Sequence, residues 1–226
     1  MTRSIIFLLF SLMIIACSKE QGKTKVIKNI SDLNELFHLK NYKTQVRLKV
    51  NDSIDHITAQ WHNFTLTGDF DTKMNNRTGI WTLKNSTNSK EILIDYLIFD
   101  KKDVFKNQII FKEYNKIDSS VSKFYVKQKT AKELVMNFFS PKVKDEIYKE
   151  AKIRYLILRN SKEIKKDSII YKNMKMKEGK YLINIKYDFK KDDIVKGYFG
   201  ETVLLNGKNK DSIVMGDNTI YFIERF

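Results

Sequence analysis

The segment TQVRLKV, residues 44 to 50, decides the fold class, because polar and apolar side chains alternate along it from Gln45 to Val50. Successive side chains of a β-strand point to opposite faces, so a period of two predicts a strand. The segment YLINIKYDF, residues 181 to 189, repeats this alternation with larger apolar side chains. The two segments predict a mainly β protein.

Further strands are expected between turns that carry Asn, Asp and Gly. The chain has one proline and eight glycines, so Asn, Asp and Lys must supply many of the turns. The spacing predicts an N-terminal antiparallel β-meander over residues 29–119 and a C-terminal β-sandwich-like domain over residues 120–226. The other expected strands are 54–60, 64–67, 80–84, 92–99, 105–112, 122–127, 195–205 and 219–226.

Few helices are expected, and both candidates are short. The segment SDLNELF, residues 31 to 37, has a capping serine and then apolar residues at helical spacing. Residues 130–159 are ambiguous: Ser140-Pro141 resembles a helix cap with proline in the first turn, whereas 133–139 and 153–158 fit strands. We expect a second short helix in the middle of this stretch.

Residues 1–16 have the features of a secretory signal: a short basic start, then a nearly unbroken apolar run. The run is too short to span a bilayer as a stable helix. It ends at Cys17, the chain's only cysteine, and polar residues follow at once. This pattern predicts a lipoprotein signal peptide that is cleaved before an acylated cysteine. An uncleaved anchor or an ordinary buried helix is the alternative.

Acylation of Cys17 would tie the chain to a membrane, because several acyl chains together give durable anchoring. Residues 17–28 are polar and without periodicity, so we expect a flexible tether there. No other thiol remains for disulfides, thiolate catalysis or a zinc site. The mature fold must then be held by its core.

The chain is strongly basic, with 42 Lys and Arg against 27 Asp and Glu and a net charge of +15. An exported protein meets anionic lipids, acidic glycans and other proteins rather than nucleic acid. We therefore expect a membrane contact through Cys17 and a protein or acidic glycan partner, and no nucleic acid. The lysines are mixed with acids along the chain, so an ordinary solvated surface is the alternative.

The sequence contains no motif of the readable catalytic kinds, such as a Gly-x-Ser-x-Gly elbow or a Gly-rich phosphate loop. We therefore predict that the protein is not an enzyme and has no catalytic residue. Glycoside hydrolysis stays open, because it needs only two carboxylates that meet in space. The acids that we would inspect for such a pair are Asp188, Asp192 and Asp193.

No metal or cofactor is expected. The nearest approach to a metal site is a group of acids and histidines around one strand, where a hydrogen-bonded or exposed pair of histidines is the alternative. Its members are Asp52, Asp55, His56 and His62. The third histidine, His38, is expected to be the partner of a helix terminus.

Aromatic residues make up 12% of the chain, enough for a platform that stacks sugars or anchors a partner. On half-buried strands such residues also fill the core, so both readings stay open. We choose Trp61, Trp81 and Tyr198 as candidate binding-face residues. Other aromatics of interest are Tyr96, Tyr125, Tyr181 and Phe199.

The segments TGDF, residues 67 to 70, and RTGIWTL, residues 77 to 83, resemble a MORN-type repeat of bacterial surface and antitoxin-like proteins. In that pattern Gly68 and Gly79 permit close or left-handed backbone, while the aromatic side chains pack on the sheet. A looser second copy within residues 95–120 lacks the Gly-x-Trp pair. The resemblance implies a structural and interaction module rather than a catalyst.

The segment CSKEQ, which begins at Cys17, resembles the lysine-plus-acid signal of outer-membrane lipoproteins of Bacteroidota, with one acid where the fuller signal has two. Our leading hypothesis is a non-enzymatic envelope lipoprotein that presents a binding face. Whether it faces the periplasm or the cell surface stays open. The alternatives are a periplasmic immunity or inhibitor protein against a toxin, and a glycan-binding or glycan-hydrolysing surface protein.

Overall fold

Antiparallel strands make up most of the protein in a computed structural model, which describes residues 30–99, 104–159, 162–163, 170–207 and 212–226. Strands account for 68% and helices for 4%, which confirms the mainly β fold class. The expected signal peptide, Cys17 and the tether lie outside the described residues. Among the described helices, none has the length and apolar character needed to cross a membrane.

The chain divides into two units, residues 1–36 and 37–226. The described part of the first unit is helix α2 (Ile30–Leu36), where Leu33 and Leu36 are buried. It lies where the sequence predicted the first helix. The second unit begins near a 3-10 helix, η1 (Leu39–Asn41). His38 is the N-cap residue of η1 and makes no side-chain cap hydrogen bond there, while its carbonyl oxygen accepts from the backbone N–H of Asn41 at 3.0 Å.

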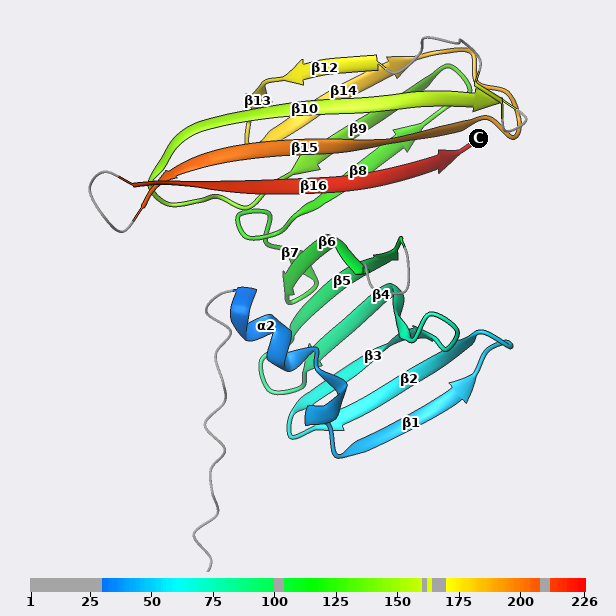
Figure 1. Ribbon diagram of the computed structural model, residues 1–226, viewed down its shortest axis with the longest axis vertical. Coiled ribbons are helices and arrows are strands. Elements are labelled where there is room, and N and C mark those ends of the chain that lie inside the picture. Colours follow the sequence, from blue (N-terminus) through cyan, green and yellow to red (C-terminus); the bar gives the residue numbers. More distant parts are fainter. Residues whose placement is uncertain (1–29, 100–103, 160–161, 164–169, 208–211) are drawn as a thin grey trace, which may run out of the picture. The chain divides into compact units, whose positions relative to one another are not determined.

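The first sheet of the second unit is a seven-stranded antiparallel meander whose strands follow the order of the chain. Figure 1 shows them side by side, from cyan to green. Alternation puts apolar side chains on one covered face, where Ile57, Leu66 and Ile94 are fully buried. The predicted β-meander is confirmed. Its strands are β1 (Thr44–Lys49), β2 (Ile54–Trp61), β3 (Phe64–Asp71), β4 (Asn76–Asn85), β5 (Lys90–Ile98), β6 (Val104–Glu113) and β7 (Lys116–Ile117).

Strand β1 is an edge strand, and all of its residues are exposed. Val46 and Leu48 are 51% and 62% exposed, because they lie on the open face of the sheet. The pairing register aligns Val46 with Thr58 and Thr58 with Thr67 on that face. The alternation therefore predicted the strand correctly, but its apolar side chains do not join the core.

Two further sheets form a sandwich around one shared core. The ring of Phe138 in one sheet stacks on Phe199 in the other, with 4.7 Å between centroids. The predicted C-terminal sandwich is confirmed. One sheet has the order β11-β10-β15-β16, with β12 on β10, and the other has the order β13-β14-β9-β8. The strands are β8 (Phe124–Lys129), β9 (Glu133–Phe139), β10 (Glu146–Arg159), β11 (Lys162–Glu163), β12 (Ile170–Met174), β13 (Met176–Lys177), β14 (Lys180–Lys186), β15 (Ile194–Asn206) and β16 (Ile213–Arg225).

The helix expected after Ser140-Pro141 is wrong. Residues 140–145 connect β9 to β10, and β10 is a single strand of 14 residues. It pairs with β15 along most of its length, and its alternate residues Ala151, Ile153 and Tyr155 enter the core. The local cap signal is overridden by this long antiparallel pairing.

Candidate functional site

Trp81 is a core residue of the first sheet, which corrects its place among the expected binding-face aromatics. Its side chain is fully buried, and the indole Nε1 donates to the carbonyl oxygen of Asp69 at 2.8 Å. Gly68 makes room for the ring, because a Cβ there would lie 2.4 Å from the indole Cγ. Gly79 takes a left-handed φ of 62°. Both glycines behave as the hairpin pattern predicted, but Trp81 offers no surface to a ligand.

Trp61 belongs to a local aromatic cluster at the end of β2. It is half-buried, and its ring centroid lies 6.2 Å from those of Tyr42 and Phe64. The following residue, His62, takes a left-handed φ of 52° in the turn to β3. Trp61 therefore closes the end of the meander and stands apart from the cavity described below.

The acids and histidines near β2 do not gather in one place. His56 Nδ1 lies 2.7 Å from Asp69 Oδ1, and Asp52 pairs with Lys49 at 3.0 Å. Within the described ranges, no group of three or more His, Cys, Asp or Glu side chains is placed to hold a metal ion. The four candidates Asp52, Asp55, His56 and His62 are therefore not assembled as a site.

Two acids of the loop before β15 form ion pairs that hold this loop in place. Arg159 Nε and Nη2 donate to the two carboxylate oxygens of buried Asp193 at 2.8 and 2.7 Å. These hydrogen bonds from Arg159 hold the pKa of Asp193 below its usual range. Asp188 pairs with Lys190, and Asp192 takes a left-handed φ of 69°. Because Asp193 is fully engaged, these acids fit a structural role better than an acid–base pair.

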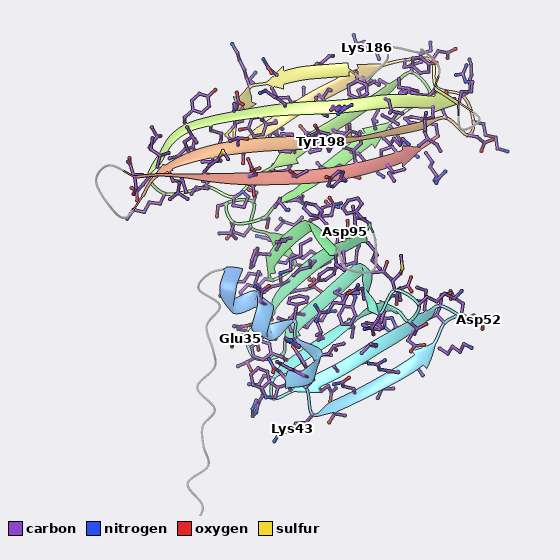
Figure 2. The ribbon with its side chains drawn as sticks, in the orientation of Figure 1. Glu35, Lys43, Asp52, Asp95, Lys186 and Tyr198 are labelled. Carbon is purple, nitrogen blue, oxygen red and sulfur yellow. The ribbon has the colours of Figure 1, made fainter. Side chains whose placement is uncertain are left out.

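Tyr198, the third candidate aromatic, lines a cavity of about 550 Å³. The cavity lies on the outer face of β10, β15 and β16 and is completed by β5 and β6 of the meander, with Asp95 on β5 (Figure 2). The register places Arg154, Tyr198 and Tyr221 in one cross-strand row. The full lining is Asp95, Leu97, Phe99, Asn107, Gln108, Tyr125, Arg154, Tyr155, Leu156, Lys196, Gly197, Tyr198, Tyr221, Phe222 and Ile223.

Aromatic rings form one wall of the cavity. The ring centroid of Tyr221 lies 5.9 Å from that of Tyr198 and 5.2 Å from those of Phe99 and Phe105. The contacts with Phe99 and Phe105 are edge-to-face, an arrangement that favours a fixed ring geometry. Phe99 remains 53% exposed. A ligand would therefore meet a partly preformed aromatic surface.

A β-bulge connects this wall to the meander. The register between β5 and β6 shifts after Asp95, so Asn107 is an extra residue whose side chain turns toward β16. The Asn107 amide accepts from the backbone N–H of Tyr221 at 2.7 Å and donates to its carbonyl at 3.0 Å. It also donates to Asp95 Oδ2 at 2.9 Å. Asn107 thus pairs with the edge strand as a neighbouring strand would and orients Asp95.

The cavity lining contains further polar and charged groups besides Asn107. Gln108 Nε2 also donates to Asp95 Oδ2, at 3.5 Å, so two amides hold the only carboxylate of the lining. Arg154 and exposed Lys196 supply positive charge from β10 and β15. Burial raises the pKa of Tyr125, whose hydroxyl donates to Glu224 Oε1 at 2.9 Å. The arrangement suits recognition through acceptors, cations and ring faces.

Sequence reasoning found Tyr198 but missed Asp95, Asn107, Arg154 and Tyr221. The alternation along β15 and β16 was a usable signal for Tyr198 and Tyr221, since it places both on the face opposite the buried residues. No local signal marks Asn107, because its role depends on a strand 114 residues away in the chain. Comparisons with protein-family models, with curated proteins and with solved structures gave no match.

Proposed function

We propose that the protein is a non-enzymatic, lipid-anchored envelope lipoprotein that binds its ligand in the cavity around Tyr198. The observation that carries this proposal is the preformed cavity, which combines an aromatic wall with a few convergent polar groups. Its volume of about 550 Å³ falls in the range of small-molecule sites, which are commonly built where two parts of a fold meet.

The chemistry of the lining favours binding over hydrolysis. Glycoside hydrolysis uses a pair of carboxylates, and the cavity lining has one, Asp95. Two side-chain amides already donate to it, so it is held as an oriented acceptor. The lining also contains no Ser, Cys or His among the described residues, so a nucleophile with its base is not provided there.

The cavity proposal is tested with the full-length protein in detergent, applied to arrays of envelope glycans and peptides. Tyr198→Ala should weaken retention of the bound probe about tenfold or more, as removal of a central aromatic contact does. Tyr114→Ala is the matched control, because Tyr114 is exposed in the turn after β6 and does not line the cavity. Mass spectrometry should recover the probe intact. Cleaved probe, or equal retention by Tyr198→Ala, would overturn the proposal.

The anchor proposal rests on residues 1–17 and is tested separately. Mass spectrometry of the mature protein should find acyl chains on an N-terminal Cys17. A Cys17→Ser variant should leave the membrane fraction, since the acyl chains supply the anchoring. Protease treatment of intact cells then decides between the surface and the periplasmic face. An unmodified cysteine on a membrane-bound chain would contradict the lipoprotein assignment.

One observation favours the alternative of an immunity or inhibitor protein. Where β10 begins and the β15–β16 hairpin ends, the side chains of Ile147, Tyr148, Ile213 and Met215 are between 50% and 66% exposed. Clustered exposed apolar residues are typical of protein interfaces, and the +15 charge predicts an acidic toxin. Met215→Lys should then abolish capture of that toxin while Tyr198→Ala leaves it unchanged. The reverse result would favour the cavity.

A further inference from the structure

We propose that the cavity binds an acidic sugar, a uronate-type residue of an anionic glycan, and this rests on the proposed binding function. The ring face of the sugar would pack against Tyr198 and Tyr221. Its carboxylate would bind the ammonium of Lys196. A ring hydroxyl would donate to Asp95.

The cross-strand register places these groups on one face. Tyr198 pairs with Arg154 on one side and with Tyr221 on the other. Lys196 lies two residues before Tyr198 on β15, so its side chain projects from the same face of the sheet. The aromatic wall and the positive charge are therefore adjacent. A ligand that stacks on the tyrosines is within reach of a lysine ammonium.

The exposed charge of Lys196 selects an anion. Lys196 is an exposed cation of the lining, and the carboxylate of the lining, Asp95, lies on β5. Asn107 and Gln108 both donate to Asp95 Oδ2, so amides of the meander hold this carboxylate. The Lys196 ammonium favours a ligand carboxylate, and such charge-assisted hydrogen bonds are among the strongest in proteins.

Asp95 and the rings distinguish a sugar acid from a simple anion. A carboxylate accepts hydrogen bonds only, so a ligand group that binds Asp95 must donate. Sugar hydroxyls donate, whereas an alkyl carboxylate offers no donor. The tyrosine faces add apolar surface for the C–H face of a pyranose ring. Donor groups, one negative charge and a flat apolar face together describe a uronate.

Methyl β-glucuronide and methyl β-glucoside form the decisive pair of probes, because they differ only at C6. This carbon is a carboxylate in the glucuronide and a neutral hydroxymethyl group in the glucoside. Both are small, so the general attraction of a +15 chain for long polyanions does not enter. Titration calorimetry on the full-length protein in detergent should show glucuronide binding about tenfold tighter than glucoside, the size of one charge-assisted hydrogen bond.

Three variants assign the effect. Lys196→Gln should bring the ratio between the two sugars close to one while glucoside binding persists. Lys186→Gln, at an exposed lysine of β14, removes the same charge away from the cavity and should change neither sugar. Tyr198→Ala should weaken both. Circular dichroism confirms that each variant folds.

The outcomes separate this inference from the proposed function. Equal binding of the two sugars, both lost in Tyr198→Ala, would overturn the acidic-sugar inference and leave the binding site standing. Binding of an aspartate-rich peptide in place of glucuronide would move the ligand class to protein. An equal loss in Lys196→Gln and Lys186→Gln would reduce the effect to general charge. Binding of no sugar and no peptide, or full binding in Tyr198→Ala, would overturn both proposals.

Discussion

Replacing Gly68 by alanine places a methyl group against the ring of Trp81. The new Cβ would lie 2.4 Å from the indole Cγ and Cδ2, closer than real Cβ contacts. The ring is fully buried and its Nε1 is bonded to the carbonyl of Asp69, so it cannot move without breaking that bond. Overpacking of this kind costs about 1–3 kcal/mol, and the reduced backbone entropy of alanine returns less than about 1 kcal/mol.

We therefore expect Gly68→Ala to lower the free energy of unfolding by about 2 kcal/mol and the melting temperature by about 4–8 °C. Urea titration followed by far-ultraviolet circular dichroism measures it. Gly216→Ala is the matched control, since no atom lies within 4 Å of its added Cβ and its φ is not left-handed. It should stay within about 0.5 kcal/mol of the parent protein.

A double-mutant cycle identifies the cause. In a Trp81→Leu background the indole is gone, so adding Gly68→Ala should cost little more. Equal stability of Gly68→Ala and Gly216→Ala would refute the close-contact argument. The same cost for Gly68→Ala with and without the tryptophan would show that backbone conformation, rather than the ring, requires glycine at this position.

Three further predictions concern the second unit. Asn107→Ala removes three hydrogen bonds and leaves both backbone groups of Tyr221 without that partner. Urea titration should show that the free energy of unfolding falls by about 2–4 kcal/mol. An unchanged midpoint would contradict the proposed role of Asn107 in holding β16. Burial lowers the pKa of Lys123 to about 8, so the folded protein loses this proton before the unfolded chain does. Unfolding free energy should therefore rise as pH rises from about 8 toward 10.5, and Lys123→Met should flatten the rise. Arg159 holds the pKa of Asp193 below 3.8, so the ionised Asp193 stabilises the fold above that pH, and this stabilisation is lost on acidification. The urea midpoint of Asp193→Asn should therefore depend less on acid pH than that of the parent protein.

Strand β1 shows how far a local pattern reaches. Its alternation depends only on neighbouring residues, so the strand could be predicted from residues 44–50. Which face is covered depends on elements elsewhere in the chain, and Val46 and Leu48 lie on the open side. The helix prediction after Ser140 was wrong for the opposite reason, because a plausible local helix cap was overridden by pairing with distant β15.

The aromatic candidates show the same division. Trp81, Trp61 and Tyr198 all lie on strands, yet one is in the core, one closes the meander and one lines the cavity. Their alternation shows which side chains share one face of a strand. It does not show which of the two faces packs against a partner sheet, since that is decided when the strands pair and pack.

The sequence by itself determined that the chain forms a meander and a sandwich, because strand periodicity and turn residues act over a few positions. Its first residues also carry the lipoprotein prediction, which depends on a local processing signal. Only the tertiary structure brought Asp95, Asn107 and Tyr221 together, since hydrogen bonds across 114 residues leave no trace in local spacing. The cavity is therefore a product of packing between strands, and its ligand follows from the chemistry gathered there.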